Sequence, residues 1–234
     1  MELSQEEIRQ LVRYLQQFVS DRRWQRMRKV RQYRTRQLTV VLEDIYQPHN
    51  ASAVLRSCDC FGVQDLHVIE NINGFEPNPD VELGASKWLT IHRYRDEPGD
   101  NTSCCLESLK RQGYRIAATS VSPSAVSLPE VRVDEPMAVC FGNEEEGLSQ
   151  TVDEYADMHI TIPMYGFTQS FNISVSAAVC MYELSERLRT ERDDWGLGEE
   201  EGLRVELQWL KNSVRDGTRI AEHFLKHYAR DVSG

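Results

Sequence analysis

The fold class is decided by residues 38–56, which read LTVVLEDIYQPHNASAVLR. The run Leu38–Leu42 is largely apolar and β-branched, which is typical of a strand buried on both faces of a sheet. A polar loop follows, and the small and apolar residues near 51–60 then indicate a helix. In open α/β sheets ligands bind at the carboxyl ends of the strands, so this polar loop is a candidate site.

The same alternation of strand-like and helix-like runs continues outward from this stretch. Further strand-like runs lie at Leu66–Ile69, Trp88–Tyr94, Tyr114–Thr119, Met137–Phe141 and His159–Ile162. Helix-like runs lie near 103–112 and 149–156 and from about 172 to 189, and Gly62 and Gly113 stand where helix C-caps belong. The pattern predicts an α/β fold, a mostly parallel sheet with helices on both faces.

Helical patterns also flank this central region. Residues 4–20 predict a helix that begins with a capping box of Ser4 and Glu7, and a basic segment continues or follows that helix. A linker pattern spans residues 190–198, and a last helical region comes after it. We therefore expect a helical, basic N-terminal extension (1–36), a central domain (37–190) and a helical C-terminal extension (191–234).

Charge is distributed unevenly along the 234 residues. The net charge is −10, yet Arg22–Gln37 contains eight basic residues and no acidic one, so the rest of the chain carries −18. A basic segment on an acidic body is suited to binding phosphate groups. The residues expected to bind RNA are Arg22, Arg23, Arg26, Arg28, Lys29 and Arg31. A solvated helix face, an internal clamp on acidic surface and a docking site for an acidic protein are the alternatives.

Composition argues against several classes of protein. No apolar run approaches the roughly 20 residues that span a bilayer, and the acidic start is unlike a secretory signal. The six cysteines show no C-x-x-C spacing, and the six histidines are scattered without paired-ligand spacing. These features favour a cytoplasmic protein with reduced thiols, without a metal site and without a membrane partner.

Two more segments place polar residues after a strand-like run. Residues 141–149 read FGNEEEGLS, and residues 162–176 read IPMYGFTQSFNISVS. Gly142 permits close approach of the backbone to a ligand. Taken alone, Asn50, Ser170 and Asn172 could be helix caps, and Arg56 could be an ordinary exposed arginine. Adjacent glutamates are usually a solvated face or a helix start.

Together, in this order, the three segments resemble the SpoU family of RNA ribose 2′-O-methyltransferases, most closely its TrmH-like tRNA enzymes. The resemblance spans about residues 38–189. Asn50 and Arg56 match the first motif, Glu144 the second, and Ser170 and Asn172 the third, whereas Asn143 replaces a common Gln and Phe171 replaces a Leu. The resemblance implies a deep C-terminal trefoil knot, a homodimer formed through the knotted region, and S-adenosyl-L-methionine as cofactor.

The resemblance also implies roles for these residues. Arg56 is expected to act with an adjacent RNA phosphate to orient the ribose, so that phosphate or a transiently neutral guanidine takes the 2′-hydroxyl proton. Asn50 and Ser170 would position nucleotide and arginine, Asn172 would order the pocket, and Glu144 would hold Arg56 or Asn50. The residues expected to line the cofactor site, mainly through backbone groups, are Thr119, Gly142, Ile162 and Phe171.

The expected substrate is a guanosine in the D loop of tRNA. Relatives that act on ribosomal RNA usually carry a separate folded domain at the N-terminus, and about 36 residues before the core are too few for one. Ribosomal RNA methylation is the alternative activity, and a non-catalytic RNA-binding protein on the same scaffold is the alternative class. The five matched motif residues argue against the second alternative, because a pseudoenzyme should have lost some of them.

Overall fold

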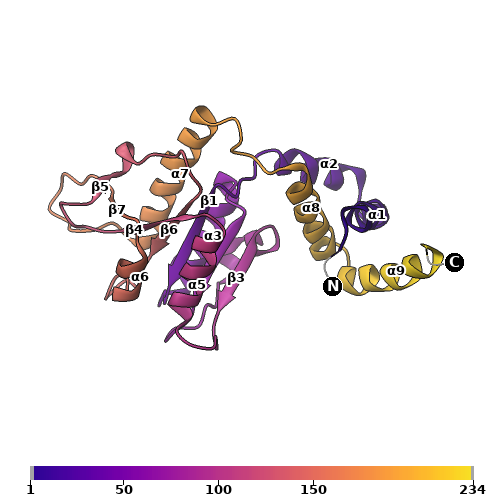
Figure 1. Ribbon diagram of the computed structural model, residues 1–234, viewed down its shortest axis with the longest axis horizontal. Helices are drawn as coiled ribbons and strands as arrows, with labels where there is room; N and C mark the ends of the chain where they lie inside the picture. Colours follow the sequence, from indigo (N-terminus) through magenta and orange to yellow (C-terminus); the bar gives the residue numbers. More distant parts are fainter. Residues whose placement is uncertain (1–2, 233–234) are drawn as a thin grey trace. The chain divides into compact units, whose positions relative to one another are not determined.

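The computed structural model describes residues 3–232, and side chains as far as residue 226. The chain folds into two units, whose elements are drawn in Figure 1. One unit joins the two ends of the chain, up to Arg34 and from Gly196 onward, and the other is the continuous stretch Thr35–Trp195. The helical extensions expected at either end therefore make up a single unit.

The terminal unit is helical. It contains α1 (Gln5–Leu15), a 3-10 turn η1 (Gln16–Phe18), α2 (Asp21–Arg31), α8 (Glu199–Ser213) and α9 (Gly217–Val232). The predicted capping box of Ser4 and Glu7 is confirmed at the start of α1. Ser20 caps α2 as a separate helix, so the basic segment follows the first helix rather than continuing it. An ion pair of 3.0 Å between Arg9 and Glu199 joins α1 to α8.

Only some of the cations in the basic segment, residues 22–37, are exposed to solvent. Arg22, Arg23, Arg26, Arg28 and Lys29 are exposed. Three other cations of the segment are used inside the protein. Arg31 Nε lies 3.4 Å from the carboxylate of Glu206, the Arg34 guanidinium covers the Trp209 ring, and Arg36 donates to Asp65 at 2.7 Å. Arg31 therefore already has an internal carboxylate partner, and the prediction that it binds RNA stays a prediction.

The central unit contains a parallel sheet of seven strands in the order β3-β2-β1-β6-β4-β7-β5. The strands are β1 (Leu38–Glu43), β2 (Asp65–Ile69), β3 (Thr90–Tyr94), β4 (Arg115–Thr119), β5 (Val126–Ser127), β6 (Met137–Phe141) and β7 (Met158–Thr161). Every residue of β1 and β6 is buried, as the apolar runs predicted. The expected α/β fold with a parallel sheet is confirmed.

Helices cover both faces of this sheet (Figure 1). On one face α3 (Pro48–Phe61) and α7 (Ile173–Glu191) share a core with β1, β6 and their neighbours. On the other face α5 (Asn101–Arg111) and α6 (Gln150–Tyr155) pack against the opposite side chains of the same strands. Helices on both faces bury successive strand residues on alternate sides of the sheet, which explains why β1 and β6 are largely apolar.

Some elements differ from the sequence expectation. The strand expected from Trp88 begins at Thr90, because Trp88 caps the 3-10 helix η2 (Ala85–Lys87). The two-residue strand β5, the helix α4 (Pro79–Glu82) and the 3-10 helix η3 (Leu128–Glu130) were not predicted. Elements this short carry too few residues to show a hydrophobic period. Gly62 caps α3 in a left-handed conformation, and Gly113 adopts one directly after α5. The trefoil knot stays a prediction.

The strand order brings separate loops to one edge of the sheet. The chain builds β2 and β3 on one side of β1, and β6 and β4 on the other. Parallel strands end at the same edge, and the reversal of order beside β1 opens a crevice there in sheets of this kind. The loops after β1, β6 and β7 therefore converge. Among the described helices none is long and apolar enough to cross a bilayer.

Candidate active site

The carboxylate of Glu144 binds the start of helix α3. It accepts hydrogen bonds from the backbone N–H groups of Tyr46 (3.1 Å) and Gln47 (3.3 Å). It also accepts one from the side-chain amide of Asn50 at 2.7 Å. Gln47 is the N-cap residue and makes no side-chain cap, so Glu144 supplies the negative charge that a helix N-terminus favours. A residue from the loop after β6 thus caps a helix that begins 96 positions earlier in the chain.

Asn50 connects the first motif to the third. It is the third residue of α3 and only 2% exposed, so the capping alternative for Asn50 is wrong. Besides donating to Glu144, it accepts a hydrogen bond of 3.1 Å from the side-chain amide of Asn172. Asn172 is the N-cap of α7 and accepts from the backbone N–H of Ser174 at 2.9 Å. One hydrogen-bond chain, Glu144–Asn50–Asn172, therefore joins all three motifs.

Arg56 does not take part in this chain. Its side chain is exposed on α3, and among the side chains that the structure describes, which end at residue 226, no hydrogen bond or ion pair involves its guanidinium. Of the two partners expected for Glu144, the structure pairs it with Asn50 and not with Arg56. An exposed arginine without an internal counter-ion is available to bind an external anion such as phosphate.

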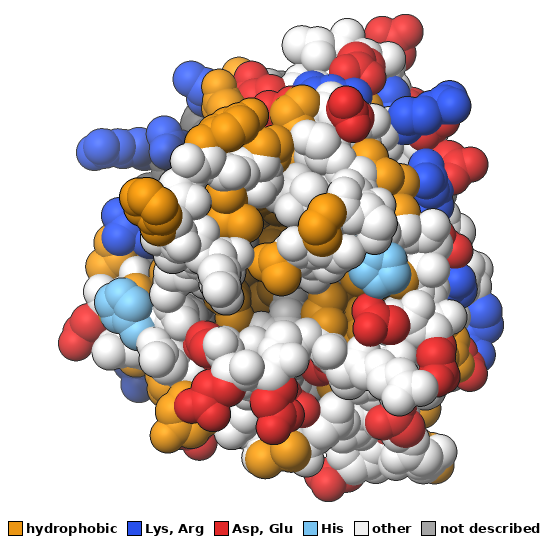
Figure 2. All heavy atoms as spheres, turned by 90° about the vertical axis from the view of Figure 1, so that its left-hand side faces the viewer, with side chains coloured by type: hydrophobic (Ala, Val, Ile, Leu, Met, Phe, Trp, Pro, Cys, Tyr) orange, Lys and Arg blue, Asp and Glu red, His pale blue; other side chains and the backbone are white. Residues whose placement is uncertain are grey.

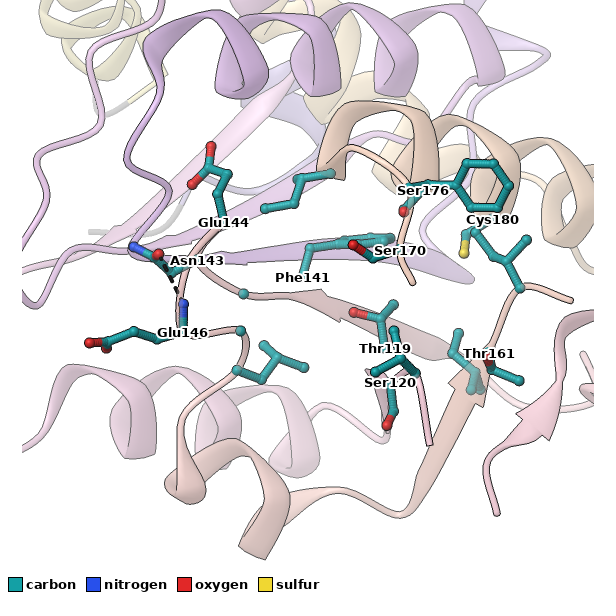
Figure 3. A pocket seen from close by; sticks show the side chains of 18 of the residues that line it. Thr119, Ser120, Phe141, Asn143, Glu144, Glu146, Thr161, Ser170, Ser176 and Cys180 are labelled. Carbon is teal, nitrogen blue, oxygen red and sulfur yellow. Dashed lines mark hydrogen bonds between the residues drawn. The ribbon is translucent and has the colours of Figure 1, made fainter. Parts of the chain in front are cut away.

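A cavity of about 460 Å³ opens at the carboxyl ends of β4, β6 and β7. Residues from both the second and the third motif line it, including Glu144 and Ser170. All four residues expected at the cofactor line it as well: Thr119, Gly142, Ile162 and Phe171. Figure 3 shows Asn143, Glu144 and Glu146 to the left of this cavity and Thr161, Ser176 and Cys180 to the right. In Figure 2 the surface is hollowed, with acidic side chains gathered along one side of the hollow.

The wall made by residues 142–149 is held at several points. Asn143 and Gly147 exchange two backbone hydrogen bonds of 2.9 Å. The buried carboxylate of Glu43, at the end of β1, accepts from the backbone and the hydroxyl of Ser149 at 2.8 and 2.7 Å. A Cβ on Gly142 would lie 2.2 Å from backbone atoms of Gly147. A glycine at position 142 therefore also allows the loop to fold back closely on itself, besides lining the cavity.

The cysteine that lines the cavity is a poor nucleophile. Cys180 lines it, but burial raises the pKa of this thiol to about 12, so the thiolate is scarce near neutral pH. Thr119 donates its hydroxyl proton to the carbonyl of Cys140 at 2.8 Å, which ties β4 to β6. The described residues also contain no group of three or more His, Cys, Asp or Glu side chains that could hold a metal ion. The arrangement suits binding and positioning rather than covalent catalysis by the protein.

Sequence reasoning missed two acidic residues that shape the site. Glu43 holds Ser149, and Asp44 holds the loop after β2, accepting from the backbone N–H groups of Asn71, Ile72 and Asn73. The carbonyl of Asp44 also accepts from the Asn143 side chain at 2.9 Å. A carboxylate at the very end of a buried strand was the signal available in the sequence, since such a group needs hydrogen-bond donors.

A family model and two similar proteins all relate this chain to RNA methyltransferases. A family model described as the SpoU rRNA Methylase family matches residues 37–182. The tRNA (guanosine(18)-2′-O)-methyltransferase of Borreliella burgdorferi is 42% identical over 202 residues, which are 86% of this chain and 90% of the relative. The protein of the same name from Aquifex aeolicus is 33% identical over 205 residues, 86% of this chain and 94% of the relative.

A solved structure agrees in fold as well as in sequence. The crystal structure of the A. aeolicus TrmH/SpoU tRNA modifying enzyme matches with a TM-score of 0.72 and 30% identity. The match covers 83% of this chain and 98% of that chain, so it includes helices outside the central sheet. The chain therefore belongs to the SpoU family, and it is an S-adenosylmethionine-dependent RNA ribose 2′-O-methyltransferase.

Proposed function

We propose that the enzyme methylates the ribose 2′-hydroxyl of guanosine 18 in the D loop of tRNA, the position for which its relatives are named. The observation that carries the proposal is the Glu144–Asn50–Asn172 chain together with the exposed Arg56, which lies on the same helix as Asn50. It joins the motif residues into one preorganised unit at the mouth of the crevice. The relatives' names favour tRNA over the ribosomal RNA in the description of the family model.

The cavity suits S-adenosylmethionine in size and lining. Its volume of about 460 Å³ lies in the range of ordinary small-molecule sites. We assign the cofactor to Thr119, Gly142, Ile162 and Phe171 because all four line the cavity. When bound, this cofactor supplies a methyl group already activated on a sulfonium. The protein is then required mainly to orient the RNA and exclude water.

The motif residues divide this work. Arg56 is free to bind the phosphate next to the target ribose through its planar, charged guanidinium. Asn50 is fixed by bonds on two sides, so it offers a rigid polar edge to the nucleotide. Ser170 lines the cavity and is exposed, which suits a hydroxyl that positions nucleotide or arginine. Asn172 orders the start of α7 and thereby the wall of the cavity.

The substrate assignment is tested with purified protein, labelled cofactor and a tRNA transcript. We expect methyl incorporation at guanosine 18, and none into a matched tRNA that carries 2′-deoxyguanosine there. Incorporation into ribosomal RNA with none into tRNA would contradict the assignment and favour the ribosomal alternative. RNA binding without any methyl transfer would favour a non-catalytic protein. A reaction on tRNA also fits a cytoplasmic enzyme, as do the six free cysteines of the chain.

We further propose that the exposed cations of α2 bind the phosphate backbone of the RNA. Reversing the charge of Arg22, Arg26 and Lys29 to Glu should weaken tRNA binding, because counterion release then contributes less to binding. The slope of log affinity against log salt should become flatter by about one unit for each phosphate that the variant no longer neutralises. Filter binding at several salt concentrations measures this slope.

The matched control reverses three exposed arginines of the central unit, Arg95, Arg111 and Arg132, for the same change in net charge. If both variants flatten the salt slope equally, the effect is one of overall charge and α2 is a solvated face. Calorimetry with S-adenosylmethionine should give the same affinity for both variants, since no residue of either set lines the cavity.

A homodimer is the last element of the proposal. Val175, Val179 and Tyr182 follow one another at helical spacing on α7 and are 44%, 36% and 58% exposed. A stripe of large apolar side chains in water is typical of an interface, and we assign it to a second copy of the chain. Substituting Val175 and Val179 with Asp should convert the dimer to a monomer in analytical ultracentrifugation. A monomeric wild type, or a variant that stays dimeric, would contradict this assignment.

A further inference from the structure

Tyr46 is a large aromatic residue that the fold leaves exposed beside the active site. Its side chain is 63% exposed, whereas the preceding residue, Ile45, is buried in the core. Among the described side chains no ring contact or hydrogen bond involves the Tyr46 side chain. The ring is thus free to meet a ligand at the carboxyl edge of the sheet.

The backbone of Tyr46 is tied directly to the motif residues. Its N–H donates to Glu144 at 3.1 Å, and the same carboxylate accepts from Asn50 at 2.7 Å. Two positions earlier, Asp44 accepts backbone hydrogen bonds from the loop after β2 and one from the Asn143 side chain. These hydrogen bonds fix the backbone on both sides of Tyr46. A planar ligand that stacks on the ring therefore costs little conformational entropy of the backbone.

An aromatic platform suits the chemistry of the reaction. A ribose presented to an enzyme brings its base with it, and a base that leaves its neighbours in the RNA loses stacking. An aromatic side chain replaces that stacking without demanding a particular base. Tyr46 shares its anchor, Glu144, with Asn50, the residue assigned to positioning the nucleotide. This shared anchor makes the base of the methylated nucleotide the expected stacking partner of Tyr46.

We propose that the Tyr46 ring stacks on the base of the nucleotide whose 2′-hydroxyl is methylated. This inference rests on the proposed methylation of RNA and adds a subsite for the target base. Tyr46 is a binding residue here, since the assigned roles in orienting ribose and phosphate belong to Asn50 and Arg56.

The test is a binding cycle with the full-length protein. Wild type and the variants Tyr46→Ala, Tyr46→Leu and Tyr46→Phe are compared on a tRNA transcript, and on the same RNA with an abasic ribose at the target position. On intact RNA, Tyr46→Ala should weaken binding by about 5- to 150-fold, the range measured for loss of one base–aromatic stack. Tyr46→Phe should bind like wild type, and Tyr46→Leu should bind less tightly than Tyr46→Phe because it lacks a planar ring.

The abasic RNA separates stacking from a structural effect. If the ring stacks on the target base, Tyr46→Ala should cause no further loss on RNA that lacks this base. An equal loss on both RNAs, or no loss on intact RNA, would overturn the proposal. The affinity for S-adenosylmethionine should be unchanged in every variant, since Tyr46 does not line the cavity. Methyl transfer by the wild type is scored separately, so a failure of the tRNA assignment is distinguishable from a failure of the stacking subsite.

Discussion

Replacing Arg56 with alanine is expected to slow methyl transfer by about 100-fold or more, as for other preorganised charged groups that act on the reacting centre. The guanidinium is exposed on α3 without an internal partner. Its removal should therefore weaken RNA binding without removing any contact that stabilises the fold. Stability should therefore change by at most about 0.5 kcal/mol. Single-turnover rates with saturating cofactor measure the effect, and calorimetry should show unchanged S-adenosylmethionine affinity because Arg56 does not line the cavity.

Two variants make this experiment specific. Arg111→Ala removes another exposed arginine, at the end of α5, and should leave the rate unchanged. Arg56→Lys keeps the charge but loses the planar fork, so it should recover only part of the rate. Activity of Arg56→Ala within about tenfold of wild type, equivalent to about 1.4 kcal/mol of barrier, would contradict a catalytic role for the arginine.

Replacing Gly142 with alanine is expected to damage the cofactor cavity directly. The new Cβ would lie 2.2 Å from the carbonyl carbon and oxygen of Gly147 and 2.3 Å from the N of Leu148. The loop has little room to yield, because Asn143 is bonded to Gly147 and Ser149 to Glu43. We expect S-adenosylmethionine affinity to fall at least tenfold and stability to fall by about 1–3 kcal/mol, the usual cost of overpacking.

The chain offers a matched control for this substitution. Gly166 lies in the loop after β7, and a Cβ there would meet nothing within 4 Å. Gly166→Ala should therefore leave both cofactor affinity and thermal stability close to wild type. Calorimetry measures the cofactor affinity of both variants, and thermal unfolding measures their stability. A Gly142→Ala protein with the affinity and melting temperature of wild type would show that the loop adapts, contrary to the packing described here.

The sequence alone was sufficient to predict the sheet and its layers. Leu38–Leu42, apart from Thr39, and Met137–Phe141 are apolar, and the structure buries both strands because helices cover both faces of the sheet. Ser4 and Glu7 predicted the start of α1, since a capping box acts within a few residues. Signals of this kind are local, and the side chains involved are neighbours along the chain.

The residues that line the cavity were predicted through the resemblance to the SpoU family, and the strand pattern agrees with that prediction. Thr119, Gly142 and Ile162 each follow or end an apolar strand. In a parallel sheet such positions meet at one edge, whatever the details of their loops. The close approach of Gly142 to Gly147 could not be predicted from the sequence, because it depends on how the loop folds back.

The pairing of side chains was decided by the tertiary structure. Glu144 accepts a hydrogen bond from Asn50 and none from Arg56. Asn172 donates one to Asn50, which lies 122 positions earlier in the sequence. Likewise, Arg31 pairs with Glu206, on a helix from the opposite end of the chain. The order of strands and the packing of helices set which carboxylate faces which donor. Local propensity determined that these helices and strands exist, whereas only their assembly determined which charges are paired inside the protein and which remain for RNA.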